Sequence, residues 1–98
     1  MEKSTPHHDL ETVKRLVRDK SVRITNTALH GAHLLGLEYG DVLDALLSLA
    51  RGDFYKSMTS YADHREWQDV YRPNTSAGRF CLKLTIRNGV LPLSFKEL

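Results

Sequence analysis

The sequence predicts an α+β domain in which helices pack on one face of an antiparallel β-sheet. The hydrophobic period changes from helical spacing in the first half of the chain to alternation in the second half. Each predicted helix has one apolar face, which must be buried against another layer. The length of 98 residues suits one hydrophobic core rather than two. We therefore expect a single domain over residues 1–98, mainly helical in 1–52 and mainly strands in 53–98.

Three helices are predicted in the first half. The first begins after a suitable N-cap, Asp9. Its apolar residues recur at helical spacing: Leu10, Val13, Leu16 and Val17. The second is capped by Thr25 or Asn26 and ends at Gly36 in the left-handed C′ position. The third has a broad apolar face from Val42 to Leu49 and is expected to end at Gly52.

Four strands are predicted in the second half. They cover Phe54–Ser60, Trp67–Arg72, Arg79–Arg87 and Val90–Lys96. The last two strands are joined by Asn88-Gly89, a strong signal for a type I′ hairpin turn because both positions need positive φ. Pro92 has no amide proton, so we expect the last strand to lie at a sheet edge or to be bulged there.

The composition excludes several classes of protein. With 41% hydrophobic and 27% charged residues, the chain is neither disordered nor collagen-like. No apolar run is long enough for a transmembrane helix, and residues 1–3 lack the apolar character of a signal peptide, so no membrane partner is expected. A single cysteine, Cys81, excludes an intrachain disulfide, and a reducing cytoplasm is the expected location.

No standard catalytic or metal motif is present. Phosphate-binding glycine loops, HExxH and GxSxG are all missing from the sequence, and no metal or cofactor is expected. His30 and His33 share a predicted helix, but two ligands do not make a zinc site. We expect His7, His8 and His64 to be surface residues; the alternative for His7 and His8 is that they cap the first helix or reach an active site.

The distribution of charge favours a basic C-terminal half. The net charge of +2 is too small to indicate nucleic-acid binding. Residues 1–50 carry six Lys and Arg against seven Asp and Glu, whereas residues 51–98 carry eight against five. The basic surplus therefore lies in the predicted strands.

Strand alternation gathers cationic and polar side chains on the sheet face that the helices leave open. This face is expected to carry Lys56, Met58, Gln68, Arg72, Cys81, Lys83, Ser94 and Lys96. Cations can hold phosphates, while the nearby rings of Tyr55, Trp67 and Tyr71 can stack on unpaired bases. The same pattern equally fits a solvated face that discourages strand pairing, and for Met58 core packing is nearly as favourable.

Such a face can also cleave RNA without a metal. RNA supplies its own nucleophile, the 2′-hydroxyl, which attacks the adjacent phosphate. The protein must position it, assist proton transfer and stabilise the extra negative charge. Lysine and arginine suit the last task, and a lysine whose pKa is lowered by neighbouring cations can move a proton.

Several stretches resemble the MqsR family. This family comprises mRNA interferase toxins of bacterial type II toxin–antitoxin pairs, with a fold related to the RelE toxins. The matching stretches are Met1-Glu2-Lys3, Thr5-Pro6-His7, Asp53–Thr59, Trp67–Pro73 and Ser94-Phe95-Lys96-Glu97. The heptapeptide Trp67–Pro73 and the block Phe54–Thr59 are specific, whereas the helical half matches mainly in pattern.

The resemblance implies roles for individual residues. Lys56, Gln68 and Lys96 occupy the positions that the family implicates in RNA cleavage, and Met58 and Arg72 occupy positions that line the site. Cys81 stands where a family member has tyrosine, which puts cleavage efficiency and base preference in doubt. We expect Cys81 to act as a filler, with a neighbour such as Tyr55 or Tyr71 supplying the missing ring.

The resemblance also implies a substrate and a partner. The substrate would be mRNA, cut at GCU-containing sites independently of the ribosome. The partner would be an MqsA-type antitoxin with a zinc-binding N-terminal domain and a helix-turn-helix domain, through which alone the toxin would reach operator DNA. Two alternatives stay open: a non-catalytic nucleic-acid-binding module, and an antitoxin-binding protein whose nuclease activity has decayed.

Overall fold

The computed structural model describes residues 1–61, 63–75 and 78–97, apart from the side chains of Lys96 and Glu97. The elements in chain order are β1 (Glu2–Lys3), α1 (Leu10–Arg18), β2 (Val22–Ile24), α2 (Asn26–Leu34), α3 (Tyr39–Leu47), the 3-10 helix η1 (Arg51–Asp53), β3 (Phe54–Thr59), β4 (Trp67–Tyr71), β5 (Asn74–Thr75), β6 (Gly78–Leu84) and β7 (Leu91–Glu97). Within these ranges, no helix has the length and apolar character needed to cross a membrane.

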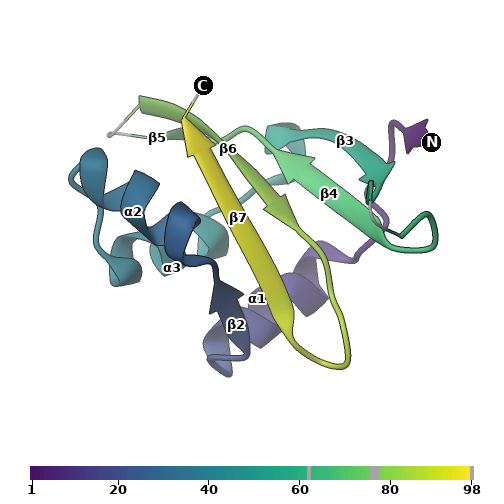
Figure 1. Ribbon diagram of the computed structural model, residues 1–98, viewed down its shortest axis with the longest axis horizontal. Helices are drawn as coiled ribbons and strands as arrows, with labels where there is room; N and C mark the ends of the chain where they lie inside the picture. Colours follow the sequence, from purple (N-terminus) through teal and green to yellow (C-terminus); the bar gives the residue numbers. More distant parts are fainter. Residues whose placement is uncertain (62, 76–77, 98) are drawn as a thin grey trace.

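The strands form one open sheet in the order β1-β3-β4-β6-β7-β2, with β5 paired to β6 (Figure 1). All of these pairs are antiparallel except β2 with β7, which is parallel. The α+β class is confirmed, and the four strands predicted in the second half are present. Two short edge strands from the N-terminal half, β1 and β2, extend the sheet beyond what hydrophobic alternation indicated.

The helix boundaries follow the capping chemistry. The Asp9 carboxylate accepts the amide of Thr12 at 3.2 Å, and the Thr25 hydroxyl accepts the amide of Ala28 at 3.0 Å. Gly36 follows the end of α2 with φ of +78°, as predicted. The prediction that the third helix ends at Gly52 is wrong, because α3 ends at Leu47 and Gly52 lies in η1.

The last hairpin forms as predicted, but its proline does not lie at an edge. Asn88 and Gly89 have φ of +51° and +75°, and Arg87 pairs with Val90. Pro92 lies in β7, an inner strand between β6 and β2, opposite Arg23. On the β6 side the pairing continues past Leu84 through one bond, from the Thr85 amide to the Pro92 carbonyl at 3.3 Å, and regular β6 ends at Leu84 because Pro92 has no amide to donate the return bond.

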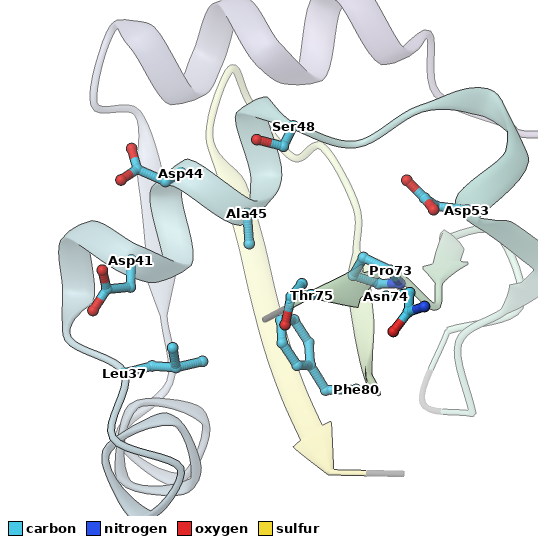
Figure 2. Close-up of a pocket in the computed structure, with 10 residues that line it drawn as sticks. All are labelled: Leu37, Asp41, Asp44, Ala45, Ser48, Asp53, Pro73, Asn74, Thr75 and Phe80. Atoms are coloured by element: carbon cyan, nitrogen blue, oxygen red, sulfur yellow. The ribbon is translucent and has the colours of Figure 1, made fainter. Parts of the chain in front are cut away.

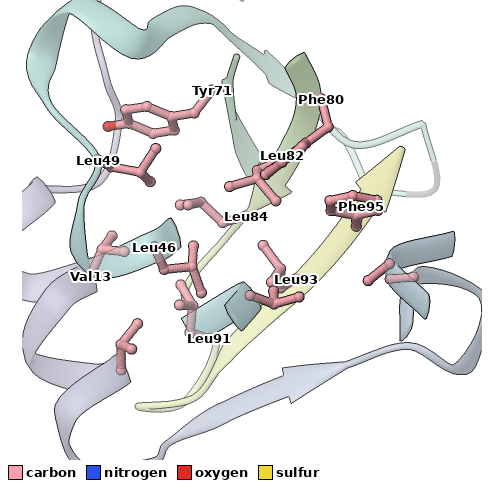
Figure 3. Packing of buried hydrophobic residues seen from close by; sticks show 14 of the residues in the cluster. Val13, Leu46, Leu49, Tyr71, Phe80, Leu82, Leu84, Leu91, Leu93 and Phe95 are labelled. Atoms are coloured by element: carbon pink, nitrogen blue, oxygen red, sulfur yellow. The ribbon is translucent and has the colours of Figure 1, made fainter. Parts of the chain in front are cut away.

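The core lies between the helices and one face of the sheet. Side chains from β4, β6 and β7 meet those of α1 and α3 in Figure 3. The buried cluster comprises Val13, Leu16, Val17, Ala28, Ala32, Val42, Leu46, Leu49, Tyr71, Phe80, Leu82, Leu84, Leu91, Leu93 and Phe95. All of its strand members project to the same face, so the opposite face of β3, β4, β6 and β7 is left free of helices.

Candidate active site on the open sheet face

The strand register brings most of the predicted site residues to the open face. Cα partners in neighbouring strands project to the same side of a sheet. Lys56 pairs with Val70, which in turn pairs with Lys83, and Met58 pairs with Gln68. The described side chains on this face of β3, β4, β6 and β7 include Lys56, Met58, Gln68, Val70, Cys81, Lys83 and Ser94.

A β-bulge adds Tyr55 to this face. Phe54 pairs with Tyr71 and Lys56 with Val70, so Tyr55 is the extra residue of β3. Strict alternation would have turned its ring to the other side of the sheet. The bulge instead leaves Tyr55 47% exposed, with the Arg72 guanidinium 3.6 Å from the centroid of its ring and the Lys56 ammonium 5.5 Å from that centroid. Cation–π contact therefore joins the three side chains.

Among the described residues, Arg72 has a free donor and an uncompensated charge, which suit the binding of an anion. Its backbone amide donates to the carbonyl of Asp53 at 2.7 Å, which fixes its position directly after β4. Its Nε atom is buried without a hydrogen-bond partner, and no carboxylate within the described ranges forms an ion pair with it. A partly desolvated guanidinium without a counter-ion is stabilised by a bound phosphate, which supplies both charge and acceptors.

Lys56 has an acidic partner that the sequence did not reveal. Glu2 of β1 pairs with Met58 in the register, and its carboxylate accepts a hydrogen bond from the Lys56 ammonium. This contact raises the pKa of Lys56 and lowers the pKa of Glu2. The hypothesis of a lysine whose pKa is lowered therefore does not describe Lys56, which stays protonated at neutral pH and acts as a donor and a positive charge.

Met58, Gln68 and Cys81 differ in how accessible they are. Met58 and Gln68 are half-buried on the open face, so Met58 does not lie under the helices. Cys81 is on the same face as Lys83, as predicted, but it is only 8% exposed. The thiol therefore fills space beneath its neighbours and presents little surface to a substrate.

Lys96 can be placed only through its backbone. Its Cα is the register partner of Cys81 in the β6–β7 pair. Its side chain lies outside the described part of the chain.

Two of the three predicted aromatic rings lie on the other face. Tyr71 is fully buried in the core, where burial raises its pKa to about 12, and its hydroxyl has no partner among the described residues. Trp67 pairs with Thr59 and stacks on the ring of His7 at 5.4 Å between centroids. Tyr55 is thus the one of the three rings available to a base at this site, and Tyr71 cannot replace the family's tyrosine.

The N-terminal arm, residues 1–9 before α1, is held by a buried carboxyl group. Asp69 of β4 is fully buried and accepts the backbone amides of His7 at 3.0 Å and His8 at 2.9 Å. The imidazole Nε2 of His8 lies 3.1 Å from the carbonyl of Trp67 and 3.2 Å from the hydroxyl of Thr85. His8 is therefore half-buried and structural rather than a free surface residue. This anchoring holds the arm in place and so positions Glu2 beside Lys56.

A separate hollow of about 370 Å³ has the wrong charge for RNA. It lies between α3 and the β5–β6 pair (Figure 2). Three aspartates line it, Asp41, Asp44 and Asp53, and Phe80 lies at its base. Negative side chains repel phosphates, so the open sheet face is the better candidate for an RNA site.

Comparison with known proteins identifies the family of the chain. Residues 5–97 match the family model described as motility quorum-sensing regulator, toxin of MqsA. A curated relative, the mRNA interferase toxin MqsR of Escherichia coli (strain K12), is 50% identical over 97 residues. That match covers 99% of both chains. Its extent shows that this chain belongs to the MqsR toxin family.

Proposed function

We propose that this protein is the toxin of a type II toxin–antitoxin pair and acts as a metal-independent endoribonuclease. Its substrate is single-stranded mRNA, which it cleaves independently of the ribosome in the cytoplasm, with a preference for GCU-containing sites. Loss of intact mRNA then arrests translation and growth. Membership of the MqsR family and the name of the E. coli relative, an mRNA interferase, support this function.

The observation that carries the proposal is the group formed by Tyr55, Lys56 and Arg72. The two cationic groups both lie within 5.5 Å of the centroid of the Tyr55 ring, on the open face of the sheet. A ring can stack on an unpaired base while the cations hold the adjacent phosphate. The combination suits a single strand, because the bases of a duplex are already stacked and paired.

The reaction is transesterification within the RNA. The 2′-oxygen attacks the adjacent phosphorus and loses its proton, while the bond to the 5′-oxygen of the next nucleotide breaks and that oxygen gains a proton. The products are a 2′,3′-cyclic phosphate and a 5′-hydroxyl. Lys56 and Arg72 stabilise the charge that develops on the phosphate oxygens, and Gln68 and Lys96 complete the catalytic group. Met58 gives the base an apolar contact.

The partner that fits the family is an MqsA-type antitoxin. The family description names the toxin of MqsA. Such an antitoxin would have a zinc-binding N-terminal domain and a helix-turn-helix domain. Operator DNA would then be bound through the antitoxin and not by this chain itself.

The test is cleavage of a defined GCU-containing RNA in the presence of EDTA. Discrete fragments are expected from the wild-type protein. Lys56→Ala, Gln68→Ala and Lys96→Ala should each reduce the rate by about a hundredfold or more, since each removes a donor to the reacting phosphate. Thermal melting should stay close to wild type, and Arg15→Ala on the exposed side of α1 serves as the control.

The same experiment separates the enzyme from a binding module. Intact RNA that is retarded on a gel without fragments would contradict the proposal and indicate a non-catalytic nucleic-acid-binding protein. Growth arrest on induction without the antitoxin gene tests the toxin role. Normal growth, together with antitoxin binding, would indicate a protein whose nuclease activity has decayed.

Cys81 is the one feature that favours a decayed nuclease. In our proposal the ring of Tyr55 stacks on the base and Cys81 only fills space, so Cys81→Tyr should not increase cleavage. A severalfold increase would show that the wild-type site is incomplete. Cys81→Phe is the matched control, because it adds the ring without the hydroxyl, and a thermal melt of both variants reports crowding around this buried position.

A further inference from the structure

A second basic region lies on the open face beyond the candidate active site. Two hollows, of about 140 and 220 Å³, meet around Arg87 and Pro92, which line both of them. The first is also lined by Gln68 and Lys83, so it begins at the site already described. The second is lined by Arg23 of β2. Together the hollows continue the open face from β4 toward the far edge of the sheet.

The charge of this region suits a polyanion. Arg23, Lys83 and Arg87 are its cations, and Glu66 is the one acidic residue among those that line the two hollows. Glu66 binds Arg87 through two contacts, 2.6 Å from Nη2 and 3.2 Å from Nε. This pair fixes Arg87 beside the hairpin. Arg23 and Lys83 have no acidic partner among the described residues.

The register places Arg23 on the same face as the site. Arg23 is the partner of Pro92, which shares the open face with Ser94 of the same strand. From β4 to β2 the path crosses β6 and β7, three strand intervals of about 4.8 Å each, or about 14 Å. Such a span exceeds one nucleotide, so a single strand that is cleaved near Gln68 must continue beyond the scissile bond to reach Arg23.

We propose that Arg23, Lys83 and Arg87 form a subsite for backbone phosphates of the RNA that flanks the cleaved bond. The inference rests on the proposed function, because the ligand is the flank of the same substrate. The strand crosses the sheet from the Tyr55–Arg72 group to the β2 edge. The subsite contributes affinity without sequence preference, since its contacts are to phosphates and not to base edges.

The experiment compares three RNAs with the same cleavage sequence. One is a core of about three nucleotides, too short to reach Arg23, one has a uridine extension at its 5′ end, and one has it at its 3′ end. Arg23→Gln should raise KM severalfold for one of the extended RNAs and leave kcat unchanged. Cleavage of the core should not change. The dependence of log KM on log salt for the affected RNA should also fall by about one unit.

Arg15→Gln is the matched control, because it removes the same charge from the exposed side of α1. The subsite is contradicted if Arg23→Gln behaves like Arg15→Gln, or if it affects core and extended RNAs alike. Binding to RNAs that lack the 2′-hydroxyls separates this outcome from failure of the proposed function. If wild type cleaves nothing, weaker binding of one extended RNA by Arg23→Gln still supports the subsite, and unchanged binding contradicts it.

Discussion

At the scale of single residues, the ion pair between Glu2 and Lys56 determines what chemistry Lys56 can perform. A hydrogen bond from the ammonium to the Glu2 carboxylate raises the pKa of Lys56. A lysine held in its protonated form stabilises negative charge or donates a proton, and it does not act as the base that activates the 2′-hydroxyl. We therefore expect RNA cleavage to require Lys56 in its charged form.

Glu2→Gln should shift the alkaline limb of the pH–rate profile to lower pH. The wild-type pair keeps Lys56 protonated as the pH rises, and the substitution removes the carboxylate that favours the charged form. Activity that depends on protonated Lys56 is then lost at a lower pH. The measurement is kcat/KM over the alkaline range, with Glu11→Gln on the exposed side of α1 as the control.

A different result would assign the opposite role to Lys56. If the neutral amine were the active form, Glu2→Gln would extend activity toward lower pH on the acid limb. If the alkaline limb stays where it is in Glu2→Gln, the ion pair does not influence catalysis.

Arg72 should contribute binding energy without sequence preference. Its guanidinium lies over the ring of Tyr55 and has no carboxylate partner in the described ranges. Arg72→Gln should weaken the binding of different single-stranded RNAs by similar factors. It should also lower the slope of log Kd against log salt by about one unit. Binding to RNAs without 2′-hydroxyls measures this separately from cleavage. An effect confined to one sequence would indicate base recognition instead.

Side-chain direction was predictable where the strands are regular. Alternation alone assigned Lys56, Met58, Gln68 and Cys81 to the open face, and the register agrees. It could not place Tyr55, because the bulge in β3 reverses the direction of that side chain and has no clear sequence signature. The same alternation places Trp67 and Tyr71 on the helix side, because each is two residues from Asp69 in β4.

At the scale of elements, local signals predicted what local chemistry determines. Caps at Asp9 and Thr25 and the turn at Asn88-Gly89 depend on neighbours in sequence, and all three are present. The strands β1 and β2 are too short for a periodic pattern. They exist because distant segments, β3 and β7, offer free edges, and this information is not contained in two or three residues.

Glu2 was missed for that reason. Nothing near position 2 indicates that it pairs with a strand more than fifty residues away. The signal that would have helped is Asp69, an acidic residue on the apolar side of β4, because a buried carboxyl group requires donors from another segment.

The N-terminal arm should depend on Asp69 for its position. Asp69→Ala leaves the amides of His7 and His8 without their acceptor, which should lower the free energy of unfolding by about 2–4 kcal/mol. Denaturant titration measures this loss. Asp63→Ala, in the loop before β4, is the control and should change stability little, because its partner Arg65 is exposed.

The arm also connects stability to the site. When Asp69→Ala releases the arm, β1 should separate from β3, and hydrogen exchange of the Thr59 amide, which donates to the carbonyl of Met1, should accelerate. Unchanged protection of that amide would show that the arm is held by other contacts.

At the scale of the whole molecule, charge is separated between two surfaces. The net charge of +2 conceals a cationic open face and an acidic hollow beside α3. Helices from the first half of the chain bury one side of the sheet and leave the other side open (Figure 1). The helices of the first half thus form the covering layer, and the strands of the second half, with β1 and β2, form the sheet that carries the candidate site.

The central claim is that RNA provides the nucleophile and that the open face stabilises the reacting phosphate. The most direct measurement compares a GCU-containing RNA with the same RNA carrying 2′-deoxy residues throughout the GCU triplet, both incubated with the wild-type protein in EDTA. We predict cleavage of the first, with a 2′,3′-cyclic phosphate at the new end, and binding without cleavage of the second. Cleavage of the 2′-deoxy RNA within the triplet, or a requirement for added metal with the unmodified RNA, would contradict the mechanism.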